Sequence, residues 1–143
     1  MNQEIGSAIW ARLKSGTALT ALLYGGTATG SASIFVDHAG DDAGLPYVII
    51  GQQSGQWAYT MGENARFQSS LWQVRAVSGK AFPKEAEAID SQIDSRLHNV
   101  SLSIGGYATL RVVRESDVRF PEVDGGQTIQ NVGALYRVDV QKT

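Results

Sequence analysis

Three side chains that could bind a metal ion or transfer a proton lie along one flank of a predicted helix. Asp90, Asp94 and His98 are spaced four residues apart, and this spacing places side chains on one face of an α-helix. Two carboxylates and an imidazole can form a metal site or an acid–base pair. The same pattern is typical of a solvated flank beside an apolar stripe, and no further glutamate motif accompanies it. We favour the solvated flank and keep a small ligand-binding or enzymatic domain as the alternative.

Two loops contain residues that suggest a ligand but lack the spacing that a ligand site requires. Residues 25–31 have glycines at the separation of a phosphate-binding loop. However, the lysine is missing, and the loop follows a helix instead of a strand, which favours a linker. The next loop holds Asp37, His38, Asp41 and Asp42, which could bind a divalent cation. Calcium-loop spacing is absent, so we favour a solvated loop there.

Nucleophilic catalysis has little support in the sequence. His38 and His98 are the only histidines, cysteine is absent, and no GxSxG motif is present. A Ser–His–Asp triad would need one of these two histidines, and neither has a nucleophile elbow nearby. We therefore expect a protein that is not an enzyme and has no cofactor or metal.

An alternating row of large side chains interrupts a polar segment. Trp57, Tyr59 and Met61 occupy every second position among Gln, Ser and Gly. The row could pack back on its own sheet, or it could form a projecting arm that docks on a neighbour. Aromatic residues and methionine are enriched at the centres of interfaces, which supports the docking arm.

The composition indicates one globular domain spanning residues 1–143. Of the 143 residues, 43% are hydrophobic and 18% are charged, and the net charge is −2. This balance excludes a disordered chain and gives no sign of general affinity for nucleic acid or membranes. The chain is long enough to bury a core without disulfides. No 18-residue apolar run or basic-then-apolar leader is visible, so we expect a soluble protein made or assembled inside a cell.

Two amphipathic helices are predicted. The first covers residues 3–14, where Ile5, Ile9 and Leu13 recur every four residues, and another turn or two follows from Thr17. The second begins near Pro83, because proline suits the first position of a helix. Its apolar stripe is narrow and consists of Ala86, Ile89, Ile93 and Leu97.

Strand patterns fill most of the remaining chain. Residues 34–36, 47–50, 66–77 and 100–104 are predicted strands, the last turning back at a glycine pair. Residues 107–141 form the dominant feature, two long strand-like runs around a reversal that contains Pro121, Asp124 and two glycines. The order helix, strands, helix, strands predicts an α+β fold: a mostly antiparallel sheet with two helices packed on one face. Other subunits could cover the remaining face or the sheet edges.

Taken in this order, the segments resemble the tail terminator, or tail completion, family of long-tailed bacteriophages. The resemblance spans nearly the whole chain. The segments that carry it are IWARLKSGTALTALLYG from Ile9, the strand at 34–36, LPYVIIG from Leu45, LWQV from Leu71, AEAIDSQIDSRL from Ala86, DGG at 124–126 and YRV at 136–138.

The resemblance implies a structural virion protein without catalytic residues. It implies a ring, commonly of six subunits, that caps the tail tube at its final length and joins the tail to the head or neck. The partners would be copies of the chain, the tail tube protein and a head-completion or neck protein, with DNA passing through the lumen without sequence-specific binding. Another neck component, such as a head-closure or adaptor protein, is the alternative within this class.

Candidate interface positions follow from both lines of reasoning. We expect axial contacts from the loops at 37–44, 52–64 and 120–130, and subunit contacts from the terminal hairpin and the aromatic row. The candidate subunit or tail interface consists of Trp57, Tyr59, Met61, Arg66, Arg119, Glu122 and Asp124.

Overall fold

The fold was established from a computed structural model, which describes residues 2–29, 33–40, 43–59, 65–80 and 82–142. Helices and strands follow one another in the order predicted from the sequence. The helices are α1 (Asn2–Lys14), α2 (Thr17–Thr20), α3 (Gly26–Thr29) and α4 (Lys84–Leu97), and the strands are β1 (Ile34–Val36), β2 (Tyr47–Tyr59), β3 (Ala65–Ser78), β4 (Tyr107–Asp124) and β5 (Gln127–Lys142).

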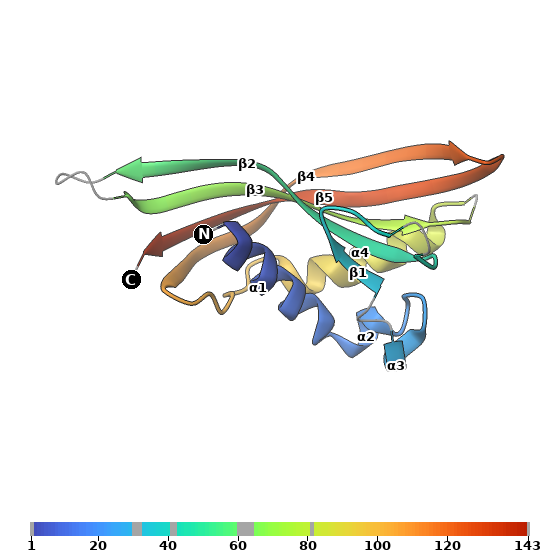
Figure 1. The fold of residues 1–143 in the computed structure, drawn as a ribbon, viewed down its shortest axis with the longest axis horizontal. Coiled ribbons are helices and arrows are strands. Elements are labelled where there is room, and N and C mark those ends of the chain that lie inside the picture. The colour runs from blue at the N-terminus through green and yellow to red at the C-terminus, as the bar shows by residue number, and fades with distance from the viewer. Residues whose placement is uncertain (1, 30–32, 41–42, 60–64, 81, 143) are drawn as a thin grey trace.

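The strands form a single sheet in the order β1-β2-β3-β5-β4. Only β1 and β2 are parallel, and the other three pairs are antiparallel. The sheet is therefore mostly antiparallel, as predicted. Figure 1 shows that the end where β2 meets β3 and the tip of the β4–β5 hairpin project from opposite ends of the sheet, beyond the helices.

Helices α1 and α4 cover one face of this sheet, with the short α2 and α3 beside them (Figure 1). The apolar stripes of both long helices are fully buried, as the spacing predicted. They pack against alternate residues of the central strands, among them Trp72, Val74, Tyr136 and Val138. The α+β class with two principal helices on one face is confirmed. The core consists of the helix stripes and the facing sheet residues, and the opposite sheet face carries no helix of the described chain.

The C-terminal ends of α1 and α4 hold each other. The Nε group of Arg12 donates to the backbone oxygen of Arg96 at 2.9 Å, and the Nη2 group of Arg96 donates to the backbone oxygen of Arg12 at 3.0 Å. The last carbonyls of a helix lack intrahelical donors, and cations are favoured near them. Each arginine therefore caps the other helix and fixes the crossing of the two helices.

Three predicted loops or strands differ in the structure. Residues 100–103 form no strand, and the reversal at the glycine pair closes with a single bridge between Ile104 and Tyr107. The segment at 52–59 continues β2 and is not a loop. The proposed loop at 120–130 is mostly strand, because β4 reaches Asp124 and β5 starts at Gln127. Cross-strand pairing thus extends through polar residues that lack a clear alternating pattern.

No helix among the described residues is long and apolar enough to cross a membrane.

Candidate functional site

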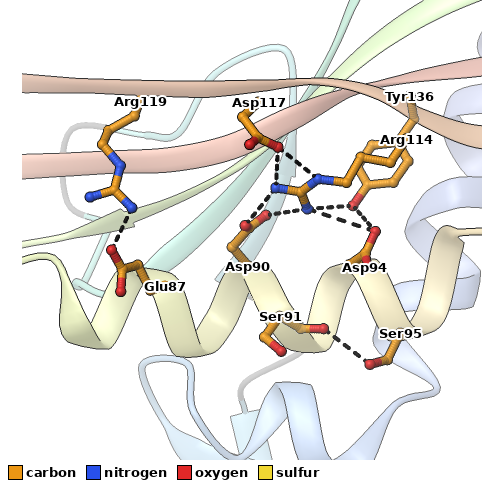
Figure 2. Close-up of polar contacts among 9 residues, drawn as sticks. All are labelled: Glu87, Asp90, Ser91, Asp94, Ser95, Arg114, Asp117, Arg119 and Tyr136. Carbon is orange, nitrogen blue, oxygen red and sulfur yellow. Dashed lines mark hydrogen bonds and ion pairs between the residues drawn. The ribbon is translucent and has the colours of Figure 1, made fainter.

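The predicted polar flank of α4 is occupied by an arginine from the sheet. Arg114 of β4 donates from Nη1 and Nη2 to the two carboxylate oxygens of Asp90, at 3.1 and 2.9 Å (Figure 2). Its Nη2 group also donates to Asp117 at 2.8 Å. The hydrogen bonds to Asp90 raise the pKa of Arg114 above its ordinary value, in spite of partial burial. The guanidinium therefore stays charged and ties the edge strand to the helix.

The buried Tyr136 of β5 completes this network from the sheet side (Figure 2). Its hydroxyl lies 3.3 Å from Arg114 Nη1 and donates to Asp94 Oδ1 at 3.3 Å (Figure 2). Burial raises the pKa of Tyr136 above its ordinary value, so the phenol remains protonated. On the other side, the backbone N–H of Arg114 donates to His98 Nδ1 at 3.1 Å.

Asp90, Asp94 and His98 are thus brought together by their spacing, as predicted, but they bind the chain's own β4 and β5. Within the described ranges, no three or more His, Cys, Asp or Glu side chains are grouped as a metal site would need. The carboxylates of Asp90 and Asp94 are paired with side chains from the sheet. The network therefore holds the sheet and the helix together.

The two loops that suggested a phosphate site and a divalent-cation site show no ligand-binding geometry in their described residues. Asp37 has a positive φ of 72° and is exposed, as is His38. Asp41 and Asp42 lie outside the described residues. In the glycine-containing segment 25–31, the linker interpretation needs correction, because residues 26–29 form the short helix α3.

The aromatic row lies at the end of β2. Trp57 is half-buried and pairs with Gln68 of β3. Tyr59 is the last residue of β2, and Arg66 lies near the start of β3. Their side chains, like Met61 as a whole, lie outside the described residues. The backbone therefore places Trp57, Tyr59 and Arg66 at one end of the sheet, and the projecting-arm interpretation remains a prediction.

The other candidate interface positions lie toward the opposite end, on β4. Arg119 forms an ion pair with Glu87 of α4 (Figure 2). Glu122 accepts a hydrogen bond from Asn131 Nδ2 at 2.6 Å. Asp124 is the exposed last residue of β4, before the two-residue turn at Gly125 and Gly126, both of which have positive φ. The structure therefore separates the described candidate residues into two groups: Trp57, Tyr59 and Arg66 lie at the β2–β3 end of the sheet, and Arg119, Glu122 and Asp124 lie toward the tip of the β4–β5 hairpin (Figure 1).

The helix-free face of the sheet carries cross-strand ion pairs. Arg111 of β4 bonds Asp139 of β5 through Nε at 3.1 Å and Nη2 at 3.0 Å. Arg137 of β5 donates from Nε to Glu115 of β4 at 2.7 Å and lowers the pKa of that carboxyl group. These cations are neutralised by their own neighbours across the strands.

Sequence reasoning missed a hollow beside the end of β2. It measures about 490 Å³ and is bordered by Phe67 and Leu110, whose side chains are 37% and 54% exposed. Asp139 Oδ1 is buried here without a hydrogen-bond partner in the described part of the chain. An exposed apolar rim around an unpaired acceptor is typical of a contact surface. Nothing in the local pattern marks it, because the bordering residues come from four strands.

Arg114 was also missed, although a signal existed. It follows Leu110 and Val112 at intervals of two, so it lies on the face that Val112 buries. A charged side chain on an otherwise buried sheet face requires an oppositely charged partner from the helices that pack on that face. The acidic flank of α4 supplies that partner.

Together, the fold and these surfaces define a class of protein: a small α+β domain in which the polar cluster on α4 is satisfied by the chain's own side chains, and in which parts of β2 and β4 have no outer partner strand among the described residues. A family model for tail completion protein gp17 matches residues 7–140. The chain therefore belongs to the tail completion protein gp17 family. It is a structural component of a phage virion and not an enzyme.

Solved structures share this fold. A chain from the virion of a native gene transfer agent particle aligns with a TM-score of 0.75 and 15% identity, over 96% of this chain and 94% of the other. A second structure, which carries no functional description, aligns with a TM-score of 0.58 and 16% identity, over 100% of this chain and 96% of the other. At these identities the likeness concerns the fold. A comparison with curated proteins gives no match.

Proposed function

We propose that the chain forms a closed ring, of six copies as the family resemblance implies, that caps the tail tube and ends its polymerisation. The ring then offers its other surface to a head-completion or neck protein and so joins tail to head. Family membership and the virion structure with the same fold support this proposal.

One observation supports the ring. The two edges of the sheet are different, and their unpaired stretches, on β2 and on β4, lie toward opposite ends of the molecule (Figure 1). A ring requires a heterologous interface, in which each subunit offers one surface to the next copy and a different surface to the previous one. The two separated groups of candidate residues, around Trp57 on β2 and around Glu122 on β4, match that requirement.

We further propose that DNA passes through the lumen without sequence-specific binding. The net charge of −2 argues against tight phosphate binding, which would slow the passage of DNA. The ion pairs of Arg111 and Arg137 on the helix-free face also leave these cations neutralised.

Light scattering over a concentration series, with negative-stain images of the heaviest species, tests the ring. A closed ring with a central hole is the expected result. If the protein is monomeric at every concentration, the same measurement is repeated with tail tubes, because a template can be needed for assembly. Failure to bind tube ends would overturn the capping function, and binding to head or neck particles alone would favour a head-closure or adaptor protein.

A further inference from the structure

The outer edge of β2 is covered for only a short part of its length. β1 pairs with Val48, Ile49 and Ile50, and the backbone N–H of Asp37 then donates to the oxygen of Ile50 at 2.7 Å. The positive φ of Asp37 turns the chain away at this point. From residue 51 to residue 59, β2 has a partner strand only on its β3 side within the described chain.

This open stretch lacks the usual protection of an edge strand. Its sequence, GQQSGQWAY, contains no charged residue and no proline, although natural edges are commonly blocked by these residues. Two irregularities in pairing, between Gln52 and Ser54 and between Ala58 and Tyr59, are the only such devices in the stretch. An uncharged and unpaired edge of this length is expected to pair with another strand.

The outer edge of β4 is also covered along only the first part of its length. Near its beginning, the backbone N–H of Asn99 donates to the oxygen of Val112 at 2.8 Å, and the N–H of Arg114 donates to His98. From residue 115 to residue 124, no strand of the described chain lies on this side. Pro121 is compatible with an edge, because edge strands tolerate a missing N–H.

Four of the five charged residues in this β4 stretch contact the chain's own side chains, among them Glu122 with Asn131, and Asp124 is exposed beside the turn. Glu115 bonds Arg137, Asp117 bonds Arg114, and Arg119 bonds Glu87. These partners lie on the two faces of the sheet or on α4, so the charges do not stand in the way of a strand that approaches the edge.

We propose that neighbouring copies join by pairing residues 51–59 of β2 with residues 115–124 of β4, so that the sheet continues from subunit to subunit; this inference rests on the proposed ring. Successive antiparallel pairing makes β4 run opposite to β2. Rotation about an axis that is tilted from the strands keeps one copy's β4 roughly antiparallel to the next copy's β2. The two open stretches lie toward opposite ends, so pairing them staggers adjacent subunits along the strands, and strand tilt allows a staggered sheet to close on itself, as in a barrel.

A cysteine scan tests this pairing, because the chain has no native cysteine. Ser54→Cys or Gln56→Cys on β2 is combined with Ser116→Cys or Val118→Cys on β4. All four positions lie on the helix-free face by register. Assembled protein is treated with a mild oxidant and, separately, with a short bismaleimide that tolerates a small register error. Disulfides form only between closely apposed cysteines.

Double variants are expected to give a ladder of linked species up to the ring size, which the oxidised samples lose on reduction. Single variants, and the pair Ser54→Cys with Ser91→Cys on the exposed side of α4, are expected to give no ladder. Rings that are visible in micrographs but linked by no double variant would overturn the pairing and leave the ring intact. Efficient dimers from β2 single variants would also overturn it, because they show β2 pairing with itself. Absence of rings, even on tail tubes, would overturn both proposals.

Discussion

Arg114 on β4 and Asp90 on α4 face each other through two parallel hydrogen bonds of 3.1 and 2.9 Å. The side chains are 23% and 13% exposed, so the pair is largely shielded from water. It joins the edge strand of the sheet to the helix that covers the sheet. The residues that first suggested a metal site therefore hold the long hairpin against the core.

Asp90→Ala is expected to lower the free energy of unfolding by about 2 kcal/mol, because it leaves a shielded guanidinium with one partner fewer. Urea denaturation monitored by tryptophan fluorescence measures this change. Asp117→Ala is the matched control: its side chain is 81% exposed, and its loss is expected to cost less than about 0.5 kcal/mol. Equal effects from both variants would contradict a structural role for the Asp90 pair.

Tyr136→Phe is expected to remove part of the loss of stability at alkaline pH. Burial raises the pKa of Tyr136 above 10.0 in the folded protein, so above that pH the unfolded chain releases the proton while the folded chain keeps it. The free energy of unfolding then falls by up to about 1.4 kcal/mol per pH unit. The free energy of unfolding, measured by denaturation at several pH values between about 9 and 11, should fall less steeply with pH for the variant than for the wild type. Exposed Tyr24→Phe should follow the wild type, and parallel curves for all three proteins would refute the prediction.

Gly133→Ala is expected to destabilise the sheet by on the order of 3 kcal/mol or more. A β-carbon at Gly133 would lie 2.3 Å from the backbone oxygen of Val74 and 2.5 Å from the α-carbon of Arg75, and backbone cannot move aside without breaking the ladder. Gly51→Ala is the control, since no atom lies within 4 Å of its added carbon. Thermal or urea denaturation would distinguish them, and a stable Gly133→Ala protein would contradict the close strand packing.

Trp57→Ala is expected to weaken ring formation or tail docking by roughly tenfold while the monomer remains folded, as for an aromatic anchor in an interface. Light scattering and tube-binding assays measure the first effect, and circular dichroism measures the second. Trp72→Ala should behave differently, because Trp72 is 3% exposed and its truncation is expected to cost about 3–5 kcal/mol of folding stability. Normal assembly of Trp57→Ala would remove this residue from the interface.

Ser54→Lys is expected to reduce assembly, because it places a charge on the unprotected edge of β2. Ser91→Lys adds the same charge to the exposed side of α4 and is expected to assemble normally. Analytical ultracentrifugation of both variants, with urea denaturation to confirm folding, makes the comparison. If both assemble equally well, the β2 edge is not an interface.

Sequence patterns predicted much of the architecture. The period of Ile5, Ile9 and Leu13, and that of Ile89, Ile93 and Leu97, identified both long helices and their buried sides. These signals were reliable because each helix buries one continuous stripe, which its own sequence encodes. Alternation in β3 and β5 was equally informative, because one face of each strand packs on the helices.

Strand length was harder to predict. Polar residues at 52–59 and 120–124 belong to strands because β3 and β5 supply hydrogen-bond partners beside them. Residues 100–103 alternate, but no strand of the described chain pairs with them, and they form no strand. Backbone pairing is a property of two segments, and the pattern of one segment does not record the presence of the other.

By itself, the sequence determined the α+β class, the helix faces, the terminal hairpin and the absence of cysteine chemistry. Only the tertiary structure decided that Arg114 occupies the acidic flank of α4, that Gly133 lies against the backbone of β3, and that the open edges extend toward opposite ends of the sheet. Local periodicity follows from the geometry of a single element, whereas partners and edges follow from how distant segments meet.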